Sequence, residues 1–341
     1  MLEGKTLVIG DGGWGQAIAM ALHRAGREVS VWGFDAAYCA KVSMSRENSL
    51  YLSGVKIPEE ITWTGDVGQA SDGAVECYSV APTQFLRATL ERFGDRLKGI
   101  PIVSASKGLE ISTLSRPTEI LAEFSGSSEM IAVLSGPSHA EEVSRGLATT
   151  VVAAASDPQL ATRCQKRIAS ESFRVYTSPD CLGVELGGAL KNIIAVAAGV
   201  ADGIGLGDNA KAALVSRGLI EMARFGEVCG ASRETFFGLS GAGDLMVTCY
   251  SEHSRNRSLG NRIGKGETLD QILASTAKVA EGVWTTKAIQ AAAEKRGIEM
   301  PITEALYGIL FENADVIRVV KELMNRPSKP ELDPQISAHV E

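Results

Sequence analysis

Short runs of β-branched and other apolar residues alternate with helix-length stretches through the first half of the chain. This alternation is typical of a parallel β-sheet with helices on both faces. The predicted strands are Thr6–Ile9, Glu28–Trp32, Ala74–Ser79, Pro101–Ser104, Met130–Leu134, Thr150–Ala154 and Arg174–Tyr176. The pattern therefore predicts an α/β domain built on a doubly wound, mostly parallel sheet.

From about Pro179 the pattern changes to long segments with the apolar period of helices. These segments are rich in Ala, Leu and Gly, and they predict an all-α second domain. Prolines among polar residues then predict a loosely held tail. We expect a first domain over residues 1–178, a helical domain over residues 179–326 and a tail over residues 327–341.

A glycine-rich turn joins the first predicted strand to a helix that runs to about Ala25. Gly10, Gly12 and Gly15 have the spacing G-x-G-x-x-G, and a second strand follows the helix. Such glycines allow a tight turn whose backbone N–H groups approach a pyrophosphate at the helix N-terminus. Asp35 lies 20 residues after Gly15, where these folds place the acid that binds the ribose. We predict a Rossmann-type domain; a glycine-rich turn without a ligand is the alternative.

Three further loops fall at the carboxyl ends of predicted strands, where ligands bind in open α/β sheets. They span residues 81–83, 104–108 and 135–140, and all consist of small or polar residues. Lys107 is the only cation in them, so it is a candidate ligand-binding residue. An ordinary solvated lysine is the alternative.

Lys191 and Asn192 interrupt the middle of a helix, Gly183–Ala201, that is apolar nearly all round. Such a helix is expected to be buried, and a buried ammonium is either paired or has a lowered pKa. Lys191 is thus a candidate acid/base that faces a cleft. The alternative is a lysine that reaches solvent at a domain edge. Asp244, in a glycine-broken apolar stretch, is a candidate counter-charge for Lys191 or a helix N-cap.

A polar run, Ser254-Arg255-Asn256, follows this stretch. An arginine beside hydroxyl and amide side chains is well suited to bidentate phosphate binding. A charged surface turn is the alternative.

Composition restricts the class of protein. The chain has 34 Lys and Arg against 41 Asp and Glu, a formal charge of −7, which argues against nucleic-acid or anionic-membrane partners. No apolar run reaches the roughly 18 residues of a membrane span, and the first residues are too short for a signal peptide. Six scattered cysteines predict reduced thiols in the cytoplasm, and no residue cluster suggests a metal site.

Together these motifs resemble the bacterial NAD(P)-dependent sn-glycerol-3-phosphate dehydrogenase family over essentially the whole chain. The matching stretches are Gly10–Gly15, Ser106–Gly108, Ser135–Glu142, Gly187–Asn192 and His253–Arg257, with Gly207–Ala213 and Met300–Ala305. Gly13 stands where Ser is usual in the family, residues 80–82 depart from its usual order, and Ser53 replaces a Pro. None of these departures removes a group that the chemistry needs.

The resemblance implies an enzyme that interconverts dihydroxyacetone phosphate and sn-glycerol 3-phosphate with NAD(P)H and feeds glycerophospholipid synthesis. Lys191 would be the proton donor and acceptor, and the reacting end would be lined by Lys107, Asn192, Asp244 and Thr248. The substrate phosphate would be held by Ser254, Arg255 and Asn256, with Gly136 and Ser138 nearby. The dinucleotide would contact Gly10, Gly12, Gly13, Trp14, Gly15, Phe34, Asp35, Lys107, Ala140, Arg255, Val279 and Glu281. A homodimer is also expected to be possible.

The corner after the second strand bears on the choice of cofactor. Residues 32–38 contain no cation, and none follows before Lys41. An ionised Asp35 would accept hydrogen bonds from ribose hydroxyls and repel a 2′-phosphate, while Phe34 could cover the adenine. We therefore predict NAD rather than NADP, with NADP still possible. The alternative for Asp35 is a cap of the next helix.

Two other functions remain open at this stage. One is another two-domain dehydrogenase that acts on a hydroxy acid or a nucleotide sugar, and the other is a non-catalytic dinucleotide sensor.

Overall fold

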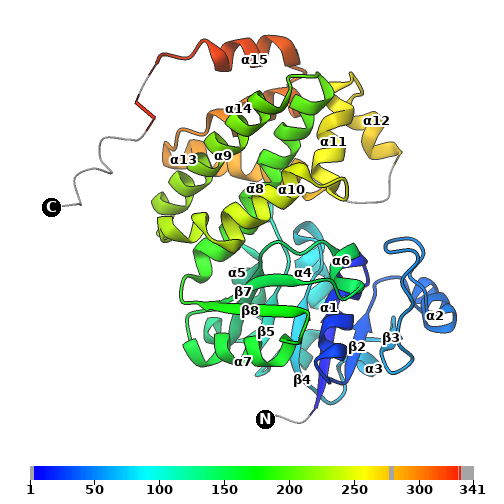
Figure 1. Ribbon diagram of the computed structural model, residues 1–341. Coiled ribbons are helices and arrows are strands. Elements are labelled where there is room, and N and C mark those ends of the chain that lie inside the picture. The colour runs from blue at the N-terminus through cyan, green and yellow to red at the C-terminus, as the bar shows by residue number, and fades with distance from the viewer. Residues whose placement is uncertain (1–3, 276–279, 329, 332–341) are drawn as a thin grey trace.

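The computed structural model describes residues 4–275, 280–328 and 330–331. It consists of an α/β domain followed by a helical domain that lies against one edge of the sheet (Figure 1). The Rossmann-type α/β fold with an all-α second part is thereby confirmed. The strand β8 ends at Ser178 and the helix α8 begins at Cys181; the exact domain limits and the tail stay predictions.

The sheet has eight strands in the order β3-β2-β1-β4-β5-β6-β7-β8. Their bounds are β1 Lys5–Ile9, β2 Val29–Trp32, β3 Thr62–Thr64, β4 Ala74–Ser79, β5 Ile102–Ser104, β6 Ile131–Ser135, β7 Thr149–Ala155 and β8 Phe173–Ser178. All seven predicted strands are present within two residues. The pattern missed β3, an edge strand of three residues, and it gave no sign that β7 runs antiparallel to β6.

Helices cover both faces of this sheet because its strands alternate their buried side chains between two cores. Along β1, Leu7 and Ile9 join the core beneath α4 and α5, whereas Val8 joins the core beneath α1 and α7. The helical elements of this domain are α1 Gly13–Arg24, α2 Ala36–Ser45, α3 Val67–Ser71, α4 Thr83–Glu91, η1 Gly94–Leu97, α5 Pro117–Ser125, η2 Ser128–Met130, α6 Ala140–Ser144 and α7 Pro158–Ile168.

The helical domain is organised around α8, which packs against α9, α10, α11, α13 and α14. Its elements are α8 Cys181–Gly203, α9 Asp208–Val228, η3 Arg233–Phe237, the π turn η4 Leu239–Gly243, α10 Asp244–Tyr250, α11 Arg255–Gly264, α12 Leu269–Ala274, α13 Glu281–Arg296, α14 Pro301–Phe311 and α15 Val316–Met324. The apolar surface of these helices forms a core of its own.

α8 is also long and apolar enough to cross a membrane, judged by length and composition alone. The expectation that no segment reaches this limit was therefore too strict. In the structure most of α8 is buried among the other helices, so its apolar character is explained by its place in the core.

Glycines bring α11 unusually close to α8. A Cβ atom on Gly260 would lie 2.0 Å from the backbone oxygen of Val196, and one on Gly199 would lie 2.1 Å from that of Arg257. Both contacts are with backbone atoms, which cannot move aside as the end of a side chain can. This close packing sets the first turn of α11 beside the middle of α8, where Lys191 and Asn192 lie.

Substitution of Gly260 tests this contact. We expect Gly260→Ala to destabilise the protein by about 1–3 kcal/mol, because the added methyl must push two helices apart. Gly308→Ala is the matched control, since a Cβ atom there meets Ala314 at an ordinary 3.5 Å. In the control the helix propensity of alanine should stabilise α14 by up to about 1 kcal/mol. Thermal unfolding of both variants measures the effect, and equal melting temperatures would contradict the steric account.

Candidate active site

The carboxylate of Asp244 lies between two lysines that come from different domains. The Nζ atom of Lys191 is 2.6 Å from Oδ1 of Asp244, and the Nζ atom of Lys107 is 2.6 Å from Oδ2. Lys191 is on α8, Asp244 is the first residue of α10, and Lys107 follows β5 at the carboxyl edge of the sheet. Lys191 is 6% exposed and Asp244 2% exposed. Lys191 is therefore a buried, paired ammonium, and Asp244 is its counter-charge and not the N-cap of α10, which is Gly243.

A third group completes the surroundings of the Lys191 ammonium. Thr248 lies one turn after Asp244 on the same face of α10, and its Oγ1 atom accepts a hydrogen bond of 2.6 Å from Lys191. An ammonium carries three protons. Asp244 and Thr248 accept two of them, so within the described part of the chain one N–H of Lys191 stays available.

The surroundings also set the charge states of these groups. Burial lowers the pKa of Lys191 to about 8, with a further lowering by the charge of Lys107, while Asp244 acts in the opposite direction. Burial tends to raise the pKa of Asp244, but the charges of Lys107 and Lys191 outweigh it and hold that pKa below its usual value. Asp244 is thus an anion near neutral pH, and Lys191 is able to exchange its proton there.

Asn192 ties the next part of the site together. Its Oδ1 atom accepts a hydrogen bond of 2.9 Å from Nδ2 of Asn256, whose own Oδ1 accepts one of 2.9 Å from the backbone N–H of Gly282. The chain of bonds links α8 to the first turns of α11 and α13. Asn192 therefore keeps its Nδ2 group as a donor at the same end of the site as Lys191.

The first turn of α11 carries the residues expected to bind phosphate. Ser254 is the N-cap, and its Oγ atom accepts a hydrogen bond from the backbone N–H of Arg257. Arg255 is exposed and has no salt-bridge partner among the described residues, so its guanidinium is available. Asp202 anchors this turn, because its Oδ2 atom accepts bonds of 2.7 Å from Arg257 and 2.9 Å from Lys211. The sequence pattern does not predict this anchor, because Asp202 lies 55 residues from Arg257.

The loop after β6 approaches the same place from the sheet. Gly136 has a φ of +143°, and a Cβ atom there would lie 2.9 Å from Cα of Val151. The Oγ atom of Ser138 donates to the backbone oxygen of Gly136 at 3.0 Å. On the facing helix, a Cβ atom on Gly188 would lie 2.6 Å from Oγ of Ser135. Small residues on both sides therefore let the sheet edge meet α8 next to Lys191.

The glycine loop has the geometry of a dinucleotide cradle. Gly10 has a φ of +120°, and a Cβ atom on Gly15 would lie 1.9 Å from the backbone oxygen of Gly10. A Cβ atom added to Gly12 would have open space around it, and one added to Gly13 would lie 3.7 Å from Cβ of Ala140. Gly12 is the N-cap of α1, so the free N–H groups of this helix lie at the loop. Trp14 ties the loop to the residues after β5, because its Nε1 donates a hydrogen bond of 3.3 Å to the backbone oxygen of Ala105.

Phe34 and Asp35, which are expected at the adenosine end of the cofactor, have other contacts in the structure. Phe34 is 65% exposed at the corner after β2. Asp35 caps α2, because its Oδ1 atom accepts a bond of 3.0 Å from the backbone N–H of Tyr38. The alternative for Asp35, a cap of the next helix, is therefore present. The second carboxylate oxygen of Asp35 can still face a ribose. The guanidinium of Arg92, at the end of α4, lies 3.9 Å from the centre of the Phe34 ring. This corner therefore does have a cation nearby, which residues 32–41 could not reveal.

Two further expected cofactor residues lie around the start of α13. Glu281 is its first residue. Burial raises the pKa of Glu281, while the charges of Arg255, Lys107 and Lys191 act to lower it. Val279 lies outside the described residues.

Comparison with known proteins identifies the family. The model for the N-terminus of NAD-dependent glycerol-3-phosphate dehydrogenase matches residues 5–161, and the model for its C-terminus matches residues 180–321. A glycerol-3-phosphate dehydrogenase (NAD(P)+) of Bacillus mycoides is 47% identical over 332 residues, which is 96% of this chain and 98% of that protein. The corresponding enzyme of Fusobacterium nucleatum is 43% identical over 96% of this chain and 98% of its own.

A solved structure agrees with this result over both domains. The crystal structure of glycerol-3-phosphate dehydrogenase from Coxiella burnetii is 34% identical, with a TM-score of 0.90 over 95% of this chain and 99% of that one. The resemblance inferred from the motifs is thus confirmed, and the chain belongs to the NAD-dependent glycerol-3-phosphate dehydrogenase family.

Proposed function

We propose that this protein interconverts dihydroxyacetone phosphate and sn-glycerol 3-phosphate, with NAD or NADP as the hydride carrier. The observation that carries the proposal is the buried Lys191 ammonium, held by Asp244 and Thr248 with one proton free. It lies where the sheet edge with the dinucleotide cradle meets the helix that starts with Ser254 and Arg255. Family membership supports the same reaction.

The cradle fits a dinucleotide on steric and electrostatic grounds. At Gly15 a side chain would collide with backbone, and at Gly12 open space remains for a pyrophosphate to approach the free N–H groups of α1. When bound, the dinucleotide supplies the hydride for reduction or accepts it in oxidation. Gly10, Gly12, Gly13, Trp14 and Gly15 would hold its phosphates, with Ala140, Arg255 and Glu281 towards the helical domain.

Lys191 does the acid/base work in this proposal. In reduction its ammonium donates a hydrogen bond to the C2 carbonyl oxygen, which favours the negative charge that grows there as a hydride reaches C2. The proton then passes from Nζ to that oxygen, giving the C2 hydroxyl. In oxidation the neutral amine takes the same proton back. Lys107 and Asn192 line the reacting end, and Asp244 keeps a counter-charge beside both lysines.

The substrate phosphate is proposed to bind at the first turn of α11. The guanidinium of Arg255 is exposed there, and the N–H groups of a helix of 10 residues point towards the same place. Ser254 and Asn256 frame this turn, with Gly136 and Ser138 across from it. An exposed guanidinium binds a carboxylate as well as a phosphate, so the choice of a phosphorylated triose over a hydroxy acid rests on family membership. A dinucleotide sensor would have no use for the buried Lys191.

The wider setting follows from these assignments. All six cysteines are free, which suits the proposed cytoplasmic location. The product sn-glycerol 3-phosphate would supply glycerophospholipid synthesis. A homodimer stays a prediction.

Removal of the Lys191 ammonium tests its role. We expect Lys191→Met to lower kcat roughly 100- to 10,000-fold, the usual scale for an acid/base group, and to leave dinucleotide binding nearly unchanged. The fold should persist because Asp244 keeps Lys107 as a partner. Lys166→Met, at an exposed position on α7, is the control. A Lys191→Met enzyme with more than about a tenth of the normal kcat would rule out the assignment.

The lowered pKa of Lys191 predicts a pH dependence. Reduction needs the ammonium, so kcat/KM for dihydroxyacetone phosphate should fall as the pH rises through about 8. The charge of Asp244 raises this pKa, so Asp244→Asn should move the fall to lower pH. Asp270→Asn, at an exposed position on α12, should leave it in place. pH profiles of the three enzymes measure the shift, and an unmoved profile in Asp244→Asn would show that another group titrates.

Arg255→Ala tests the phosphate site. We expect KM for dihydroxyacetone phosphate to rise at least about 10-fold, because a charge-assisted pair with the phosphate is lost. The cofactor is also expected to touch Arg255, so KM for NADH is measured in parallel. Arg262→Ala, further along the same helix, is the control. If only KM for the cofactor rises, the phosphate role is wrong.

A further inference from the structure

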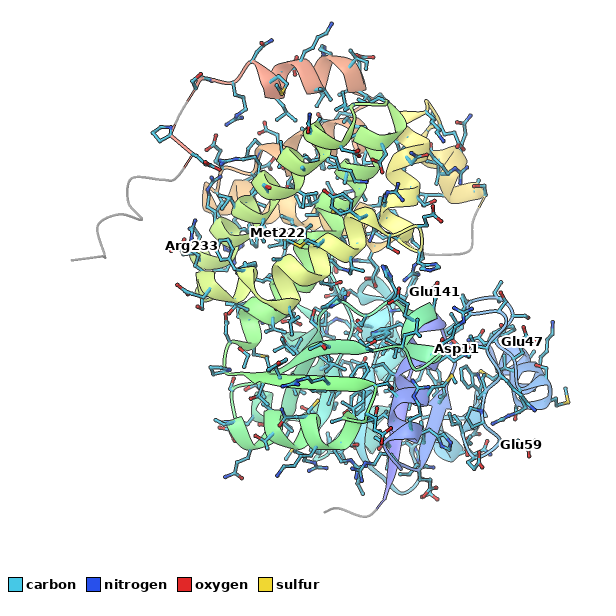
Figure 2. All side chains as sticks on the ribbon, in the orientation of Figure 1. Asp11, Glu47, Glu59, Glu141, Met222 and Arg233 are labelled. Atoms are coloured by element: carbon cyan, nitrogen blue, oxygen red, sulfur yellow. The ribbon has the colours of Figure 1, made fainter. Side chains whose placement is uncertain are left out.

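The glycine loop of this chain carries a carboxylate, Asp11, between Gly10 and Gly12. Figure 2 shows Asp11 near the edge of the α/β domain that faces the helical domain. A negative charge in a loop that binds pyrophosphate needs an explanation, because like charges repel. The direction of its side chain supplies one.

Asp11 turns away from the pyrophosphate cradle and towards the end of β2. Its Oδ2 atom lies 2.3 Å from the place that a Cβ atom on Gly33 would occupy. Gly33 directly follows β2, and its lack of a side chain leaves room for the carboxylate in this position. The carboxylate of Asp11 therefore lies at the corner where Rossmann-type folds bind the adenosine ribose.

Neighbouring side chains hold Asp11 in this position. The thiol of Cys39, on α2, donates a hydrogen bond of 3.7 Å to Oδ2 of Asp11. Burial raises the pKa of Cys39 to about 12, so the thiol stays a donor near neutral pH. The backbone oxygen of Asp11 accepts a bond of 2.8 Å from the buried Asn48, which in turn is held by Tyr38. The position of Asp11 is thus built into the loop.

The charge of Asp11 is not neutralised locally. It has no salt bridge to any Lys or Arg within the described residues, and the charge of Asp35 acts to raise its pKa. Burial raises the pKa of Asp11, and Asp35 adds to the rise, whereas its own backbone and Cys39 favour the anion. Two carboxylates therefore face the same corner.

We propose that Asp11, together with Asp35, sets the cofactor preference of this enzyme by accepting hydrogen bonds from the adenosine ribose and excluding a 2′-phosphate. The inference rests on the proposed cofactor site. Asp35 uses one oxygen to cap α2, so Asp11 adds acceptor oxygens to the one that Asp35 keeps free. A 2′-phosphate carries between one and two negative charges near neutral pH and would meet both carboxylates.

Arg92 is the cation that could oppose this effect. Its guanidinium lies 3.9 Å from the ring centre of Phe34 and 6.0 Å from that of Trp32. It therefore stacks on the exposed ring of Phe34. If Arg92 instead binds a 2′-phosphate, then its removal will weaken the phosphorylated cofactor selectively.

The test measures binding and turnover separately. Calorimetry gives the Kd of 5′-AMP and of 2′,5′-ADP, which differ only in the 2′-phosphate, and kcat/KM is measured with NADH and NADPH. For the wild type we expect 5′-AMP and NADH to be favoured. In Asp11→Asn, which keeps the shape of the side chain, the preference in both pairs should shift towards the phosphorylated ligand about 10-fold or more. Asp72→Asn, an exposed residue at the end of α3, controls for the change in net charge.

Each result has one meaning. A ratio that stays the same in Asp11→Asn, or a loss of 2′,5′-ADP binding in Arg92→Gln, overturns the inference while the enzyme still turns over. If the wild type turns over with neither NADH nor NADPH, the proposed function is contradicted instead. Asp11→Ala repeats the charge removal if Asp11→Asn does not fold, and it should shift the ratios in the same direction. A wild type that favours 2′,5′-ADP would overturn the inference directly.

Discussion

The structure depends on one carboxylate, that of Asp244, placed between two lysines of different domains. Both of its oxygens are used, at 2.6 Å from Lys107 and 2.6 Å from Lys191. A buried ion pair does not stabilise a protein merely by being there, because desolvation offsets much of the attraction. The loss of both lysines, however, would leave an uncompensated buried charge at Asp244, which is strongly destabilising. The triad therefore commits the sheet edge and the helical domain to one relative position, which is also the position that the chemistry requires.

The backbone reaches that position through residues without side chains. Gly188 lets α8 approach the loop after β6, and Gly199 and Gly260 let α11 approach α8. The proposed acid/base, Lys191, and the proposed phosphate ligand, Arg255, thus lie on neighbouring parts of two helices in backbone contact. Helices of this kind position groups more rigidly than long loops do. The same contacts explain why the helical domain is rich in glycine where a helix would ordinarily avoid it.

Much of this arrangement could be predicted from the sequence because the signals were local. The strands follow from β-branched runs, and Lys191 stands out because a lysine in an all-apolar helix contradicts its surroundings. Other features arise only in space. β3 has three residues and no pattern of its own, Asp202 meets Arg257 across 55 positions, and Arg92 reaches Phe34 from another helix. The orientation of Asp11 also could not be read from the glycine loop, because it depends on the missing side chain of Gly33.

The two acidic centres of the protein show how one residue type serves opposite ends of a reaction site. Asp244 is surrounded by cations that lower its pKa. Its negative charge neutralises only part of the charge of the two lysines, so the net charge at the reacting end stays positive. That balance suits a ketone oxygen on which negative charge develops. Asp11 has no such partner among the described residues, and the charge of Asp35 acts on it, so its charge would extend into the proposed ribose corner. With a formal charge of −7 over the whole chain, attraction and exclusion of phosphates must both be local. In the proposed sites, the position of each carboxylate relative to the lysines would therefore decide which phosphate groups the protein accepts.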